Sequence, residues 1–331
     1  MTETNSFQNK ISDYRSILMG VAMLSIMLSH QRFVHCFPFN VFEAFGHWGV
    51  DIFLFLSGMG MVRSLESHSI RQFYGRRFLR LIPLCVFCGT LKYIAYLIVG
   101  EPIENLKVGL NLGVWSIFSL DLWFIHSIII YYLLTPFYYW LLKNYPLFTM
   151  LVVYVLSIVF QLFFSQQVGF NWLNPIGIML YTIERMPVFL IGMLVTMYYD
   201  RITRKTFIYS GICLFVVVCI AVLFKLGTIP SIMNVWIYPL LSLGILTLVA
   251  SLMSVFMMTH KYVINGLNYV GKHSLEIYLV HEFIFGTFLL TTYTRYNHFL
   301  LLIFVFVLSF AIAELCRRCV DRIMIFIHWP L

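Results

Sequence analysis

Charged residues are scarce in this chain of 331 residues, because Asp, Glu, Lys and Arg together make up only 11% of it. Soluble domains are about 25% charged and about 45–50% apolar. Here 61% of the residues are hydrophobic, and the mean hydropathy is +0.88. A soluble core cannot hide this much apolar surface, so the excess has to face lipid. The scarcity of charge therefore excludes a soluble globular protein.

The sequence also lacks a long polar segment, an internal repeat and a low-complexity stretch. Nothing predicts a second domain, so we expect residues 1–331 to form one integral membrane domain with a short cytoplasmic segment, 1–16. No cleavable signal peptide is recognisable, because the apolar run after this segment has no small-residue cleavage site before a loop. We interpret that run as the first membrane span.

The seven cysteines follow no disulfide or metal-binding pattern. Cys85 and Cys88 form a CxxC pair, as do Cys316 and Cys319, but no histidine or further cysteine lies nearby at ligand spacing. We interpret the cysteines as small apolar residues on helices, with metal binding or lipidation as the alternative. We therefore predict no metal site and no bound cofactor.

Long apolar runs recur along the whole chain. A helix needs roughly 20 mainly apolar residues to cross a bilayer, and the predicted fold class is an all-α polytopic membrane protein with about ten transmembrane helices. The expected spans are 17–36, 44–64, 79–99, 121–142, 147–164, 175–198, 207–225, 235–258, 270–291 and 298–316.

Lysine and arginine between these spans predict the orientation. If the N-terminus is inside, most of these cations fall in inner segments, and only Arg32, Lys107, Lys225 and Arg295 fall in outer ones. Cytoplasmic loops carry the excess of positive charge in membrane proteins. We therefore expect both termini to be cytoplasmic, and the net charge of +8 needs no nucleic-acid partner.

Several ionisable residues fall inside the expected spans, where they are costly and indicate function. At about 1.5 Å per residue, His30 lies roughly 20 Å from the inner face of a core about 30 Å thick. Asp51 lies about 10 Å from the outer face, so the two have similar depths. We expect them to converge with three residues that also enter from outside: His126, Glu184 and Arg185.

A histidine and a carboxylate at one depth are what acid–base chemistry on a hydroxyl needs. The carboxylate fixes the imidazole tautomer, and the other ring nitrogen takes the proton. We therefore interpret His30 and Asp51 as a catalytic pair, with His281 near mid-depth of the ninth span. Structural hydrogen bonds between helices and a proton pathway are the alternatives.

A second feature is the arginine-rich inner segment before the third span, where Arg76, Arg77 and Arg80 follow one another closely. Charge alone favours contact with anionic lipid headgroups. The functional alternative is a site for a phosphorylated donor such as a cytosolic acyl-coenzyme A, because guanidinium groups pair with phosphates in a bidentate manner.

Six stretches carry motifs in a recognisable order. The first ends in a histidine, the second is similar to a GVD-F-F-x-x-SG signature, and the third contains a double arginine before a proline. The last three contain LWF, R-x-x-x-F-x-x-G and S-x-x-x-YL-x-H. They are MGVAMLSIMLSH at 19–30, GVDIFLFLSGM at 49–59, RQFYGRRFLRLIP at 71–83, DLWFIHSIIIYYLLTP at 121–136, ERMPVFLIG at 184–192 and SLEIYLVH at 274–281. In combination this order resembles the integral membrane acyltransferases called acyltransferase family 3, from the first span to the ninth.

The resemblance implies an enzyme that moves an acyl group, usually acetyl, from cytosolic acyl-coenzyme A to a hydroxyl of an extracytoplasmic or lipid-linked glycan. It implies the plasma membrane of a bacterium as the location. His30 corresponds to the catalytic histidine, with Asp51 in the signature around it. Ser57 belongs to the same signature, Arg185 and His281 correspond to residues that line the interior, and Arg76, Arg77 and Arg80 lie in the basic segment that we assign to the donor. His126 and Glu184 are included in the lining because of their depth in the spans.

Two positions depart from the family pattern and bear on the donor geometry. The family usually has Arg or Lys eleven residues before the histidine, where this chain has Met19. Arg15, one turn earlier on a similar face, is the cation that we include with the donor contacts. The family often has a histidine two residues before the Trp of LWF, where this chain has Asp121.

The mechanistic hypothesis is that His30 deprotonates the acceptor hydroxyl or briefly carries the acyl group. Asp51 would orient the imidazole, and Arg185 or Ser57 would offset the oxyanion. The competing class is a proton-coupled transporter or flippase of a glycan or small acid, in which the same ionisable residues form a relay. Such a transporter gives no reason for the basic segment, and no inverted repeat is visible.

Overall fold

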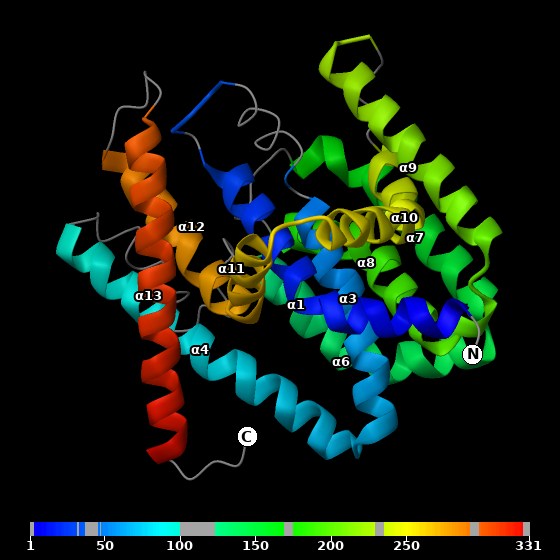
Figure 1. Ribbon diagram of the computed structural model, residues 1–331, viewed down its shortest axis with the longest axis horizontal. Coiled ribbons are helices and arrows are strands. Elements are labelled where there is room, and N and C mark those ends of the chain that lie inside the picture. Colours follow the sequence, from blue (N-terminus) through cyan, green and yellow to red (C-terminus); the bar gives the residue numbers. More distant parts are fainter. Residues whose placement is uncertain are drawn as a thin grey trace. The chain divides into compact units, whose positions relative to one another are not determined.

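The computed structural model describes residues 3–31, 33–36, 46, 48–99, 123–168, 175–228, 235–291 and 298–326. Over these ranges the regular structure is helical throughout (Figure 1). The helices are α1 (Glu3–His30), α3 (Trp48–Ser67), α4 (Ile70–Val99), α6 (Trp123–Asn144), α7 (Pro146–Val168), α8 (Pro175–Met197), α9 (Arg204–Lys225), α10 (Ile237–Met257), α11 (Lys261–Lys272), α12 (Ser274–Thr291) and α13 (Phe299–Phe326).

Among the described residues, eight helices contain a stretch that is long and apolar enough to cross a membrane. These helices are α1, α3, α6, α7, α8, α9, α10 and α13. The other two expected spans, 79–99 and 270–291, fall on α4 and mainly on α12. The prediction of an all-α polytopic membrane protein is therefore confirmed.

Three predicted boundaries were wrong. The first span ends at His30 rather than at 36, because the side chain of Gln31 bonds to the backbone that follows. A separate short helix, α11, occupies the start of the expected span 270–291. With 12 residues α11 is too short to cross a bilayer. The last span does not stop at 316, since α13 continues to Phe326.

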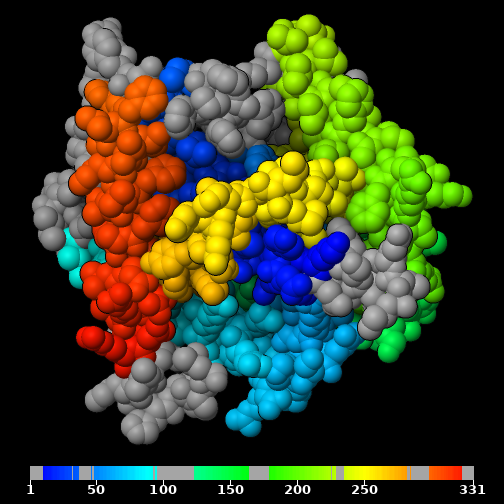
Figure 2. All heavy atoms as spheres, viewed as in Figure 1, coloured from blue at the N-terminus to red at the C-terminus, as the bar shows by residue number. Residues whose placement is uncertain are grey.

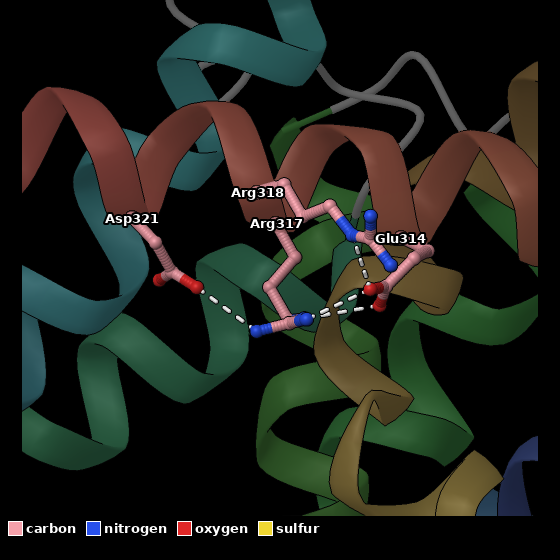
Figure 3. A network of polar contacts seen from close by, with 4 residues as sticks. All are labelled: Glu314, Arg317, Arg318 and Asp321. Carbon is pink, nitrogen blue, oxygen red and sulfur yellow. Dashed lines mark hydrogen bonds and ion pairs between the residues drawn. The ribbon is translucent and has the colours of Figure 1, made fainter.

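Charges that pair along one helix explain this continuation of α13 (Figure 3). Arg317 donates Nε and Nη2 to the carboxylate of Glu314, at 3.0 and 2.8 Å, and donates Nη1 to Asp321 at 3.0 Å. Arg318 donates Nε to Glu314 at 2.7 Å. Pairs three and four residues apart lie on one helical face and support the helix.

The chain forms two compact units from interleaved segments. The first unit consists of Met1–Leu18, Asp51–Phe73 and Trp123–Ile264. The second consists of Met19–Val50, Tyr74–Leu122 and Asn265–Leu331.

Helix α8 is the centre of the first unit, where it packs against α6, α7 and α10. It also crosses α3 closely, and glycines make this approach possible. A Cβ atom on Gly58 would overlap the carbonyl oxygen of Phe189, and one on Gly192 would overlap that of Phe55. Small residues let membrane helices approach at backbone distance. The crossing brings the first turns of α3 and the middle of α8 together.

Burial divides the helices of the first unit into inner and outer ones. In α3, 78% of the apolar stretch is buried, against 11% in α9. Side chains on the outer helices α7 and α9, such as Leu147, Phe148 and Phe215, are exposed although they are large and apolar. Such surface suits lipid rather than water. Polar side chains on α3 and α8 are therefore shielded by other helices.

In the second unit, α12 and α13 run side by side (Figure 1). Helix α11 lies against α1, as Figure 2 shows where the two meet. A Cβ atom on Gly20 of α1 would overlap the backbone carbonyl of Leu267 in α11. This contact holds the C-terminal half of α1, which ends in His30, against the segment that leads into α12.

Candidate functional site

A buried ion pair joins α3 and α8 in the first unit. Nη1 of Arg185 donates to Oδ2 of Asp51 at 2.8 Å, and the two side chains are only 2% and 3% exposed. Asp51 comes from the first turn of α3, and Arg185 comes from the middle of α8. A buried charge needs a partner of opposite sign. The close crossing at Gly58 and Gly192 keeps these partners within reach.

Aromatic rings fix the guanidinium group of Arg185. Its Cζ atom lies 4.3 Å from the ring centroid of Tyr238 and 5.3 Å from that of Trp123. The Trp123 ring in turn lies 5.1 Å from the ring of Tyr181. Cation–π attraction strengthens when the cation is desolvated. Arg185 is therefore held by one carboxylate and two rings from three further helices.

A second carboxyl group lies near this pair, because Glu184 is 5% exposed and interacts electrostatically with Arg185 and Asp51. The backbone oxygen of Glu184 accepts a hydrogen bond from the hydroxyl of Ser157 on α7. Ser57 on α3 and His126 on α6 lie half-buried in the same unit. Of the residues predicted to line the site, the structure thus brings Asp51, Glu184 and Arg185 together.

Hydroxyl groups that the sequence analysis missed hold α6 to α8 next to this cluster. Tyr131 donates its hydroxyl to the backbone oxygen of Thr182 at 2.5 Å. The hydroxyls of Ser127 and Thr182 are hydrogen-bonded at 2.7 Å. All three residues are buried. Their polarity inside apolar spans was the available signal, but neutral hydroxyls are common in membrane helices.

A pair of histidines lies in the second unit. Nδ1 of His30 and Nε2 of His281 are 2.9 Å apart, and the two rings meet edge to edge, with centroids 5.2 Å apart and planes 13° apart. His281 is fully buried, whereas His30 is half-buried. His30 is the last residue of α1, and His281 lies in the second turn of α12.

The turn after His30 is fixed by one buried amide, that of Gln31. Its Oε1 accepts from the backbone N–H groups of Phe33 and Val34, both at 3.0 Å, and its Nε2 donates to the oxygen of Val34 at 2.9 Å. The N–H of His298 donates to the oxygen of Phe33 at 2.8 Å. This role of Gln31 was not predicted from the sequence. The end of α1, and with it His30, is firmly anchored.

The arginines of the basic segment lie at the start of α4. Ser69 and Gln72 bond to each other's backbone N–H groups and so cap this helix. Arg76 and Arg80 are exposed, and Arg77 is half-buried. Exposed guanidinium groups suit a phosphorylated ligand or a lipid headgroup. Both functions of the segment stay predictions.

Arg15 belongs to the first unit, where it lies beside Gly60 of α3. The neighbouring Arg63 donates to the hydroxyl of Ser12 at 2.5 Å and so ties α3 to α1. That Arg15 acts together with the α4 arginines stays a prediction. The same holds for the pairing of Asp51 with His30, because the observed bonds join Asp51 to Arg185 and His30 to His281.

Comparison with known protein families gives one result. A family profile described as an acyltransferase domain matches residues 17–318. Comparisons with curated proteins and with solved structures found no match. The matched region includes His30, Asp51, Arg185, His281 and the arginines of α4. Since the match spans nearly the whole chain, the protein belongs to acyltransferase family 3 and is a multi-pass membrane acyltransferase.

Proposed function

We propose that the protein transfers an acyl group, acetyl in the simplest case, from cytosolic acyl-coenzyme A to a hydroxyl group of a glycan. The glycan is extracytoplasmic or lipid-linked, and the membrane is the plasma membrane of a bacterium. The observation that carries the proposal is the His30–His281 pair at the anchored end of α1. It supplies a held imidazole within a chain of an acyltransferase family.

The donor carries several phosphates, and the start of α4 carries the matching charge. Arg76 and Arg80 are both exposed at the start of this helix. Guanidinium forks bind phosphate oxygens with two parallel hydrogen bonds. In the predicted orientation this segment faces the cytoplasm, where acyl-coenzyme A is made.

The acceptor is proposed to be a sugar because the first unit places aromatic rings beside a buried ion pair. Trp123 and Tyr181 are partly exposed rings next to the Asp51–Arg185 ion pair. Sugar rings combine apolar faces, which stack on aromatic rings, with hydroxyls, which bond to charged groups. This combination of side chains supports a glycan over an apolar alcohol.

The proposed reaction is the transfer of an acyl group from a thioester to a hydroxyl oxygen. The oxygen of the acceptor hydroxyl attacks the thioester carbonyl carbon while Nε2 of His30 takes the hydroxyl proton. The new C–O bond forms, the C–S bond breaks, and the proton passes from His30 to the departing coenzyme A thiolate. The products are an ester and free coenzyme A, and His30 returns to its starting form.

A specific observation favours a second candidate, proton-coupled transport. Asp51 and Glu184 are two buried carboxyl groups in the unit that also buries Arg185, and ionisable residues inside membrane spans can form proton relays. Proteoliposomes that contain the purified protein separate the two functions. The proposal expects acyl-coenzyme A and an acceptor sugar to yield an acylated sugar and free thiol. Sugar uptake driven by a proton gradient without acyl-coenzyme A would instead establish the transporter.

A further inference from the structure

We propose that His281 is a positioning residue that fixes the tautomer of His30. Nδ1 of His30 then carries the hydrogen and donates to His281, and Nε2 of His30 holds the lone pair that accepts a proton. This inference rests on the proposed function only in naming His30 as the base. The tautomer itself follows from the hydrogen bonds of the two imidazoles.

Nδ1 of His281 faces two backbone oxygens of its own helix. It lies 2.7 Å from the backbone oxygen of Tyr278 and 3.2 Å from that of Ile277. Carbonyl oxygens only accept hydrogen bonds, so Nδ1 of His281 has to be the donor. A neutral imidazole has one N–H group and one lone pair. In the neutral ring, Nε2 of His281 is therefore an acceptor.

The tautomer of His30 follows from this acceptor. Nδ1 of His30 faces Nε2 of His281 at 2.9 Å. A lone pair on His281 requires an N–H group on His30, which places the hydrogen on Nδ1. The second nitrogen of His30, Nε2, is then the basic one. The backbone carbonyls of α12 thus fix the tautomer of His281, and His281 in turn determines which nitrogen of His30 is the base.

The surroundings of the pair suit a positioning role. His281 is fully buried, and its carbonyl partners belong to the preceding turn of its own helix. The two rings are joined edge to edge in nearly one plane, and this N–H···N contact restricts rotation of His30. In hydrolase triads a carboxylate performs this task and also stabilises the imidazolium. A neutral histidine supplies the orientation and the tautomer without a negative charge.

Two variants separate the acceptor role from simple packing. His281→Gln keeps an oxygen near the position of Nε2, so it can still accept from His30. His281→Leu keeps much of the volume but offers no acceptor. Exposed His260 is a matched control, and His260→Leu should leave His30 unchanged. Thermal unfolding of each variant shows whether it is folded before any comparison is made.

Nitrogen NMR of the full chain, labelled at histidine and held in lipid nanodiscs, reads the tautomer directly. The resonances of His30 are those that disappear in His30→Ala. We expect a protonated Nδ1 and an unprotonated Nε2 in the wild type and in His281→Gln. His281→Leu should shift His30 towards the opposite tautomer. Protonated Nε2 in the wild type, or an unchanged His30 in the folded Leu variant, would overturn the inference.

Kinetics give the second readout. His281→Leu should lower kcat about 100-fold, at the lower end of what general-base catalysis contributes. Its KM for acyl-coenzyme A should stay near that of the wild type, and His281→Gln should recover most of kcat. Equal loss in the Gln and Leu variants would contradict the acceptor role. If the wild type shows the expected tautomer without any acyl transfer, the proposed function fails and the tautomer assignment stands.

Discussion

The carboxylate of Asp51 is paired with the guanidinium group of Arg185 at 2.8 Å, in a part of the first unit where both side chains are almost fully buried. The pair links α3 to α8, the two helices that interlock through Gly58 and Gly192. Asp51 thus has a structural role, whether or not it also takes part in the reaction. Experiments on Asp51 have to separate its structural role from any catalytic role.

Removing Arg185 should be strongly destabilising. Arg185→Met leaves Asp51 as a buried charge without its partner, which costs about 3–5 kcal/mol in folded proteins. Thermal unfolding in a mild detergent measures the loss. A melting temperature equal to that of the wild type would show that the pair does not hold α3 to α8.

The double variant Asp51→Leu with Arg185→Met tests whether the pair has a part in the reaction beyond its structural role. Replacing both members of a buried pair by apolar residues is often neutral for stability. The double variant should therefore be more stable than Arg185→Met alone. If the pair takes part in the reaction, through Asp51 or through Arg185, acyl transfer stays low in this stable variant. Normal transfer would assign Asp51 a purely structural role.

The crossing of α3 and α8 should not tolerate a methyl group. Gly58→Ala and Gly192→Ala each place a Cβ atom on a backbone oxygen of the other helix. Overpacking of this kind costs about 1–3 kcal/mol. Gly75→Ala is the matched control, because a Cβ atom there meets nothing within 4 Å. Gly75→Ala should leave the melting temperature unchanged or raise it, and a similar loss in all three variants would contradict the close crossing.

Most of the fold could be predicted, because a membrane helix is recognisable in a sequence by its length and its apolar residues. The limits of the first span could not, since the end of α1 depends on the bonds that the Gln31 amide makes after folding. Helix α11 was missed because it is short and runs into the apolar residues of α12. Hydropathy averages over such a boundary.

The site was predictable in its members but not in its pairs. Asp51, Arg185, His30 and His281 all stood out as ionisable residues in apolar spans. A depth along a helix gives the height of a residue and not the direction in which its side chain points. The pairing of Arg185 with Asp51, and of His281 with His30, therefore needed the structure.

The arginines of α4 should bind the donor phosphates. Arg76→Ala or Arg80→Ala should raise KM for acyl-coenzyme A about tenfold, since a hydrogen bond to a charged group contributes about 1.5–3 kcal/mol. Arg318→Ala is the control, because Arg318 is exposed and bonded to Glu314. Acyl-coenzyme A with and without its 3′-phosphate shows which phosphate Arg76 contacts. If Arg76 binds the 3′-phosphate, Arg76→Ala should weaken the binding of these two donors to different extents. An equal loss of affinity for both donors would contradict this contact.

The charged cluster on α13 should contribute little to stability. Glu314 accepts from Arg317 and Arg318, but Arg318 is 67% exposed and Arg317 33%. Exposed ion pairs contribute about 0–1 kcal/mol and weaken with salt. Glu314→Gln should lower the melting temperature slightly, and less so in high salt. A loss as large as that of Arg185→Met would show that the cluster is a structural centre.

The most direct test of the account is donor turnover by His30 variants. The measurement is the release of coenzyme A, in the presence of an acceptor sugar, by the purified wild type, His30→Ala and His35→Ala. His35→Ala is the control, because it removes an exposed histidine from the segment after α1. The account predicts turnover in the wild type and in His35→Ala, and a loss of at least about 100-fold in His30→Ala. Normal turnover by a folded His30→Ala protein would contradict it.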